Sequence, residues 1–192
     1  MRALIFAIIF IFSTAPFSLS SVISDIDKSN IELSTRFDGT SILVFGALSP
    51  ENDSTSLLIE IIGPSTSVNI RKKVQIWGIW VNKKIARFKD IPSFYQISIS
   101  NPEHPVLIEI ENQKLKSLFY DFLEANSTPE DVNGVEQYYL ELTRLKKKLG
   151  KLSVFEEQVN IIDKKLFSHK VNLPNKIHPG SCLLYTSDAA DE

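Results

Sequence analysis

Cysteine, glycine and methionine are scarce in this 192-residue chain, which contains one cysteine, seven glycines and one methionine. The single cysteine, Cys182, cannot form a disulfide within the chain, so stability must come from a packed core. Hydrophobic residues make up 43% of the chain, which is enough for one globular domain with a sizeable core. The formal net charge of −2 argues against a nucleic-acid-binding protein, which would carry a clear positive charge.

The sequence also lacks a motif for catalysis, phosphate binding or metal binding. It contains no Gly-rich phosphate loop and no Gly-x-Ser-x-Gly elbow. Its three histidines, His104, His169 and His178, have no Cys, Asp or Glu at the spacing of a metal site. Glu109 and Glu111 share a face of an expected strand, but no partner acid or base accompanies them. We therefore predict no catalytic residue, no metal and no cofactor.

The N-terminus has the features of a secretory signal peptide. Arg2 gives a positive start, residues 3–12 form an unbroken apolar run, and Ser18-Leu19-Ser20 places small side chains before a cleavage site at Ser21. An uncleaved membrane anchor is the alternative, but this run is short for a span that needs about 20 residues. The sequence predicts a signal peptide over residues 1–20 and an exported domain after it.

Much of the remaining chain has the pattern of short β-strands. Predicted strands lie at residues 31–37, 41–47, 57–62, 74–81, 85–88, 94–99, 159–162 and 166–173. Asp38-Gly39 and Asn82-Lys83 are predicted turns between them. Strands this short and this closely spaced predict an immunoglobulin-like β-sandwich.

A helical hairpin is predicted to interrupt this sandwich at about residues 112–150. An amphipathic spacing of i, i+3, i+4 and i+7 is formed by Leu115, Leu118, Phe119 and Phe122. A second helix follows a capping box at Thr128, and its apolar stripe extends from Val135 to Leu149. The expected fold is mainly β with this insertion, and α+β overall.

The last eleven residues, Cys182–Glu192, resemble a sequencing adapter that has been translated as protein. A genuine small, acidic tail is the alternative. Under the adapter interpretation the natural domain comprises residues 21–181 and continues into strands that are missing here, which leaves the strand at 166–173 without a partner. Residues 21–181 contain 20 basic and 20 acidic residues, so this domain has no net charge to steer a partner.

Several segments resemble an uncharacterised family of alphaproteobacterial transmembrane proteins. The resemblance covers residues 25–180 and is most specific in Gly78-Ile79-Trp80-Val81-Asn82, with further matches in Phe37-Asp38-Gly39-Thr40, Arg71-Lys72-Lys73 and Pro179-Gly180. It implies a signal peptide, a periplasmic β-rich domain and one C-terminal transmembrane helix that is missing here, which would hold the full-length protein in the inner membrane. It also implies neighbouring permeases and a role in assisting an inner-membrane transporter.

One candidate interaction surface combines two tryptophans with a basic cluster. Trp77 and Trp80 lie three residues apart in one predicted strand and therefore face opposite sides of it. One of them suits a binding surface, although packing in the core is the alternative for both. Arg71, Lys72 and Lys73 suit an anion or a lipid headgroup, with a solvated surface as the alternative.

Together these features predict a membrane-anchored periplasmic binding or accessory module rather than an enzyme. Its expected partner is an inner-membrane protein, and no nucleic acid is expected. One alternative is a periplasmic enzyme with a dispersed site, for which a pocket around His104 or His169 would be evidence. Another is a soluble ligand-binding domain.

Overall fold

The structure, a computed structural model, describes residues 22–48, 56–101 and 135–188. Its elements are β1 (Val22–Ile26), β2 (Thr40–Leu48), β3 (Leu57–Ile62), β4 (Ser65–Ile76), β5 (Ile79–Pro92), β6 (Tyr95–Ile99), α4 (Val135–Lys148), β7 (Leu152–Gln158), β8 (Asn160–Ile162), β9 (Leu166–Leu173) and β10 (Leu183–Asp188). The prediction of a mainly β protein is confirmed. The predicted signal peptide and the first helix of the predicted helical hairpin lie outside the described residues.

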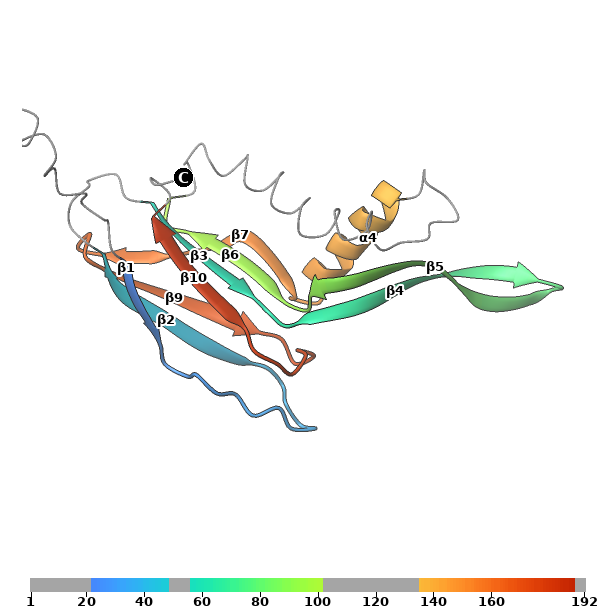
Figure 1. Ribbon diagram of the computed structural model, residues 1–192, viewed down its shortest axis with the longest axis horizontal. Coiled ribbons are helices and arrows are strands. Elements are labelled where there is room, and N and C mark those ends of the chain that lie inside the picture. Colours follow the sequence, from blue (N-terminus) through green and yellow to red (C-terminus); the bar gives the residue numbers. More distant parts are fainter. Residues whose placement is uncertain (1–21, 49–55, 102–134, 189–192) are drawn as a thin grey trace, which may run out of the picture.

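Two four-stranded sheets pack face to face. One sheet has the strand order β1-β2-β9-β8 and the other has the order β10-β3-β6-β7 (Figure 1). Apolar side chains from both sheets meet in one buried cluster, in which Val44 of β2 and Phe167 of β9 pack with Ile59 of β3. The predicted sandwich is therefore confirmed. One pairing departs from the antiparallel immunoglobulin arrangement, because β6 and β7 are parallel.

The sheet β10-β3-β6-β7 also has a second core on its outer face. There Leu58 of β3 and Ile97 of β6 pack with Phe88 of β5 and Leu142 of α4. Because successive side chains of a strand point to opposite faces, β3 contributes to both cores, and its first five residues are all buried. The molecule therefore has three layers, with β3 and β6 in the middle one.

A long two-stranded hairpin, β4–β5, continues the central pair β3–β6 beyond the edge of the sandwich (Figure 1). At the junction the amide of Gly63 donates to Phe94 O at 2.8 Å, and the amide of Ser93 donates to Pro64 O at 2.9 Å. A Cβ at Gly63 would lie 2.9 Å from Cβ of Phe94, so only glycine fits where the two strands cross the edge. The hairpin is thus anchored in the strands that both cores bury.

Two local predictions are wrong. Residues 31–37 contain no strand, and it is β1, earlier in the chain, that pairs with β2. Residues 74–81 do not form one strand that ends in a turn at Asn82-Lys83. The chain reverses at Trp77-Gly78, and Lys73 pairs with Asn82 across the hairpin. Both errors come from reading apolar alternation without the turn chemistry that interrupts it.

The C-terminal strands also differ from expectation. β9 pairs with β2 on one side and β8 on the other, so the strand predicted to lack a partner lies inside a sheet. β10, formed by the segment of predicted adapter origin, pairs with β3 through six residues, from Leu183 opposite Ile62 to Asp188 opposite Leu57. The origin of residues 182–192 stays a prediction, but in this chain they complete a sheet.

The second predicted helix is present as α4. Its last turn contains Lys146, Lys147 and Lys148, where positive charge favours the negative end of the helix dipole. Gly150 follows at a φ of 64°, a left-handed conformation typical of the residue after a helix. The predicted capping box at Thr128 lies outside the described residues.

The register of β10 can be tested by substitution of two neighbouring leucines. Leu184 packs against the core between the sheets, whereas Leu183 is 54% exposed. We expect Leu184→Asp to lower the free energy of unfolding by about 2 kcal/mol or more, because it places a charge in an apolar environment. Leu183→Asp is the matched control and should change it by about 0.5 kcal/mol or less. Urea denaturation measures both, and equal effects would contradict the register of β10.

Candidate functional site

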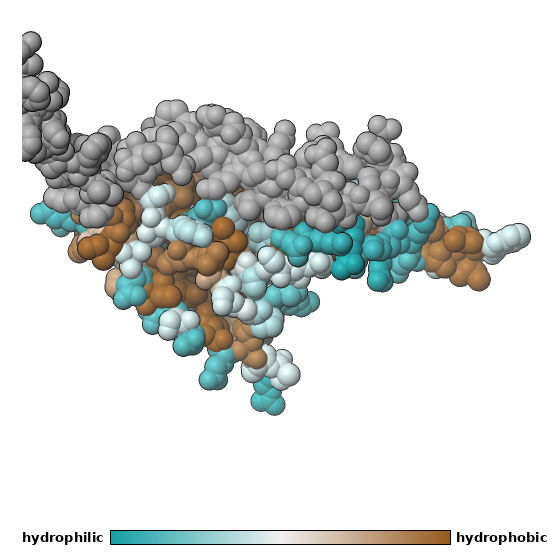
Figure 2. All heavy atoms as spheres, in the orientation of Figure 1, coloured by the Kyte–Doolittle hydropathy of each residue, from teal (hydrophilic) through white to brown (hydrophobic). Residues whose placement is uncertain are grey.

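The outer half of the β4–β5 hairpin is the most exposed strand structure in the described part of the chain. Near its base, Val68 and Ile70 pack against the second core and Phe88 is fully buried. A β-bulge follows Ile70, and beyond it the side chains of residues 71–84 are exposed, apart from Val74. Residues 71–84 are called the distal hairpin below. Figure 2 shows a hydrophobic patch close to its far end, with pale residues beyond the patch and a hydrophilic band between the patch and the body.

The hairpin turn has an unusual residue at its first position. Trp77 has a φ of 52° and Gly78 a φ of 78°, so both central residues of this two-residue turn have positive φ. Such turns match the twist of a hairpin and favour Asn-Gly. A bulky residue in this conformation costs roughly 1–3 kcal/mol. The indole of Trp77 is 97% exposed, so no packing within the described residues offsets this cost.

The cross-strand register defines two faces of the distal hairpin. Residues that pair directly have side chains on the same face. One face carries the pairs Ile76–Ile79, Val74–Val81 and Lys72–Lys83, and the other carries Gln75–Trp80, Lys73–Asn82 and Arg71–Lys84. Near the turn, one face therefore has four aliphatic residues and the other has Trp80 opposite Gln75, and both faces have basic residues behind this end. We call residues 74–81 the tip, and the residues Arg71, Lys72, Lys73, Lys83 and Lys84 the basic band.

Like charges face one another within the basic band. Arg71 lies directly opposite Lys84, and Lys72 lies directly opposite Lys83. Like charges in direct cross-strand pairs weaken a hairpin. Across the whole hairpin, residues 65–92 contain seven basic residues and one acidic residue, Asp90. A surface of this charge favours an anionic partner.

All five residues of the candidate interaction surface meet in the distal hairpin. Trp77 and Trp80 are not buried, since Trp80 is 66% exposed, so the alternative of core packing is wrong for both. They do not lie on opposite faces of one strand either, because the turn separates them. Arg71, Lys72 and Lys73 form one side of the basic band. The aliphatic residues of the tip were missed, and the dipeptide Trp77-Gly78 between two apolar stretches was the signal for a turn that would have revealed them.

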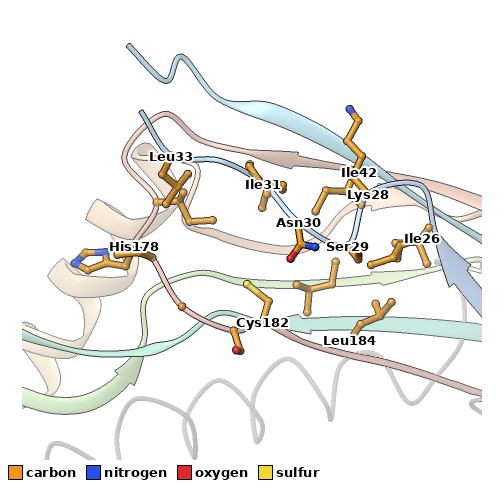
Figure 3. Close-up of a pocket in the computed structure, with 17 residues that line it drawn as sticks. Ile26, Lys28, Ser29, Asn30, Ile31, Leu33, Ile42, His178, Cys182 and Leu184 are labelled. Atoms are coloured by element: carbon orange, nitrogen blue, oxygen red, sulfur yellow. The ribbon is translucent and has the colours of Figure 1, made fainter. Parts of the chain in front are cut away.

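A second feature is a cavity of about 650 Å³ at one end of the sandwich. Figure 3 shows Ile31 and Leu33 on one side of this space and Cys182 and Leu184 on the other. The side chain of Lys28 points away from it, and its ammonium lies 3.3 Å from Ser41 O. The lining is mostly apolar, so the cavity suits a small apolar molecule more than a charged one.

The histidine considered as a catalytic candidate, His169, is part of the packed interior. Its Nε2 lies 3.1 Å from Nε2 of Gln96, and its Nδ1 lies 3.3 Å from the carbonyl oxygen of Gln158. A neutral ring satisfies both contacts, because Nδ1–H donates to the carbonyl and Nε2 accepts from the amide. Burial lowers the pKa of His169, while Gln158 O and Glu157 oppose that shift. His169 does not line the cavity, and His104 lies outside the described residues.

Other buried polar groups join the layers together. The ammonium of Lys146 on α4 donates to Pro92 O at 2.5 Å, which ties the helix to the junction of the hairpin. Burial, together with the nearby charge of Lys151, lowers the pKa of Lys146 to about 8. The hydroxyl of Tyr95 donates to Oε1 of Glu60 at 2.7 Å between neighbouring strands, and burial raises the pKa of this tyrosine. These contacts stabilise the packing between elements of the fold.

Residues 22–48, 56–101 and 135–188 contain neither a candidate metal site nor a candidate membrane-spanning helix. No group of three or more His, Cys, Asp or Glu side chains in these ranges could hold a metal ion. No helix within the same ranges is long and apolar enough to cross a membrane.

The fold and the site define a β-sandwich domain that carries a projecting hairpin with an apolar tip and a basic band. A family described as "Putative transmembrane protein (Alph_Pro_TM)" matches residues 21–187. The chain belongs to this family. The match starts at the predicted first residue of the exported domain and includes most of β10. No curated protein and no solved structure matches the chain.

The role of His169 can be tested through the pH dependence of stability. Because its pKa is lowered in the folded state, the unfolded state binds more protons as the pH falls through the ordinary value of 6.5. The free energy of unfolding should therefore fall between about pH 7 and pH 5. We expect His169→Gln to make this dependence shallower. Ser168→Ala, at the preceding residue of β9, is the control and should leave the dependence unchanged. Identical pH profiles for His169→Gln and the unaltered protein would contradict a buried neutral histidine.

Proposed function

We propose that this chain is an exported binding or accessory module that works at the inner membrane, on its periplasmic side, and assists a membrane protein such as a transporter. The distal hairpin is the part that reaches toward the membrane. The single observation that carries the proposal is its exposed apolar tip, which the strands of both cores anchor and hold away from the sandwich. The membership of a family described as transmembrane supports a location at a membrane.

The anchoring of the hairpin favours a binding function. An isolated two-stranded hairpin is marginally stable in water. Here β4 directly follows β3 and β5 directly precedes β6. The ammonium of Lys146 on α4 also donates a hydrogen bond to Pro92 O at their junction. A rigid base lets the tip meet a partner with little loss of conformational freedom, which raises the affinity for a given contact area.

The buried titratable groups support binding more than catalysis. His169, Glu60 and Lys146 are each engaged by neighbouring groups of the fold. None of the three lines the cavity. A general acid or base must be able to reach a substrate proton, so these residues are poorly placed for that role.

The cavity favours a second candidate function, the binding of a small apolar ligand. Ile31, Ile42 and Val44 line it, and its volume suits a drug-sized molecule. Two other lining residues, Cys182 and Leu184, belong to the segment of predicted adapter origin, so the hairpin carries the main proposal. Thermal stabilisation by an apolar ligand would support this candidate if Ile31→Trp, which fills the cavity, removed the effect.

The main proposal can be tested by co-purification from membranes. The chain would be expressed with its N-terminal residues 1–20 in an alphaproteobacterial host and solubilised in mild detergent. A variant in which Asn-Gly replaces residues 72–83 keeps the packed base of the hairpin but removes the tip. We expect recovery of an inner-membrane protein with the intact chain and at least about a tenfold loss with the variant, equivalent to about 1.4 kcal/mol of binding free energy.

The matched control is Leu166→Ser, which changes an exposed apolar residue on the sandwich. It should recover the same inner-membrane protein as the intact chain. If the shortened hairpin recovers that protein equally well, the hairpin is not the working surface. If the intact chain recovers no inner-membrane protein, the accessory function is wrong.

A further inference from the structure

We infer that the tip of the β4–β5 hairpin seats in the headgroup region of an anionic lipid bilayer. This inference deepens the proposed function and rests on it in taking the distal hairpin as the working surface. It adds that the tip itself contacts lipid, and that the basic band contacts the lipid phosphates.

The length of the tip fits this location. A strand rises about 3.3 Å per residue, so the tip extends about 10 Å from Val74, next to the basic band, to Trp77 at the turn. Amphipathic helices that lie in a membrane interface bury their apolar face about 5–10 Å into the headgroup and acyl boundary. A tip of this length reaches that depth while the basic band stays at the phosphates.

The tip carries an exposed apolar side chain on each face, with Gln75 opposite Trp80 on one of them, which favours insertion end-on. Ile79 is 68% exposed on one face, Trp80 is 66% exposed on the other, and Trp77 in the turn is 97% exposed. A protein groove usually covers one face of a strand pair. A bilayer surrounds an inserted tip, and tryptophan is the residue that is enriched at its interface.

The charge distribution orients the hairpin toward an anionic surface. Residues 65–92 contain seven basic residues and one acidic residue, whereas the rest of residues 21–181 contains 13 basic and 19 acidic residues. The domain is therefore neutral overall but has a positive hairpin and a negative body. A negative membrane surface attracts the hairpin and repels the body, which presents the tip first.

The two like-charge pairs of the basic band favour lipid phosphates as the counter-charges. Arg71–Lys84 and Lys72–Lys83 place four positive charges on two successive pairs, one pair on each face. Phosphates of a bilayer around the inserted hairpin would reduce this repulsion on both faces.

Insertion should be shallow. Within the described residues β4 and β5 form a two-stranded sheet, so no third strand in that part of the chain pairs with their outward backbone groups. Such groups cannot enter the hydrocarbon core without a large free-energy cost, but water and headgroups satisfy them at the interface. Residues 71–73 should therefore remain outside the acyl region.

Intrinsic fluorescence can test the inference directly, because Trp77 and Trp80 are the only tryptophans of the chain. Residues 21–192 would be titrated with vesicles of equal parts phosphatidylglycerol and phosphatidylethanolamine, and separately with phosphatidylcholine vesicles. We expect a blue shift of the emission with the anionic vesicles alone. Lipids brominated near the carbonyl end of the acyl chain should quench the emission more than lipids brominated near its methyl end.

Two sets of variants separate charge from apolar contact. Replacement of Arg71, Lys72 and Lys73 by Gln should weaken partitioning by about fivefold per charge, or about a hundredfold together. The matched control neutralises Lys148, Lys170 and Lys176, which are exposed, lie outside residues 65–92 and change the net charge equally. It should leave partitioning nearly unchanged.

The second set replaces the aliphatic residues of the tip and keeps both fluorophores. Ile76→Ser with Ile79→Ser should reduce the blue shift and the quenching at every salt concentration. An increase of NaCl from about 0.1 M to about 1 M shortens the Debye length from about 10 Å to about 3 Å, and should weaken the partitioning of the unaltered chain.

Three outcomes would overturn the inference. They are an emission that does not shift with anionic vesicles, a shift of equal size with phosphatidylcholine, and a shift that appears only when an inner-membrane protein is reconstituted in the vesicles. The third outcome would make the tip a protein-binding surface and leave the proposed function intact. Lipid binding by a chain that recovers no inner-membrane protein would uphold the inference and remove the accessory function.

Discussion

The burial of β3 and β6 on both faces is the constraint on which the rest of the structure depends. Leu57 and Ile59 contribute to the core between the sheets, while Leu58 contributes to the core beneath α4. Strands that are buried on both faces cannot slide or twist without disturbing two cores at once. Since β4 and β5 continue the same two strands, this fixed pair also determines where the hairpin points.

The anchored base explains how the distal hairpin tolerates unfavourable features. The positive φ of Trp77 and the like-charge pairs of the basic band each weaken the hairpin locally. Neither feature contacts a core cluster, so their costs do not reach the packing that determines the fold. Features that lower local stability without a structural benefit are typical of surfaces selected for binding.

Much of the fold could be predicted from the sequence because its strongest signals are local. The apolar runs of β3 and β9 were placed with their observed bounds, and the stripe after Val135 identified α4. The hairpin was misread because Ile76 and Ile79 flank a two-residue turn and read as one continuous run when Gly78 is treated as part of a strand. β1 was missed because Val22–Ile26 is mostly exposed and its place in the sheet depends on pairing with β2, a contact that no local pattern records.

The candidate site was predictable in composition but not in arrangement. Trp77, Trp80 and the basic residues stand out in the sequence, and their types already suggested a membrane or a partner. Their arrangement depends on the position of the turn, since a turn at Asn82-Lys83 would place Lys83 and Lys84 at the turn and leave residues 71–73 far from them. With the turn at Trp77-Gly78, each basic residue before the turn is brought opposite a residue after it, and the apolar residues gather at one end. The position of the turn thus decides whether the hairpin ends in an apolar tip with positive charge on both faces behind it. An apolar end followed by positive charge fits an anionic bilayer, where phosphates lie above the acyl region.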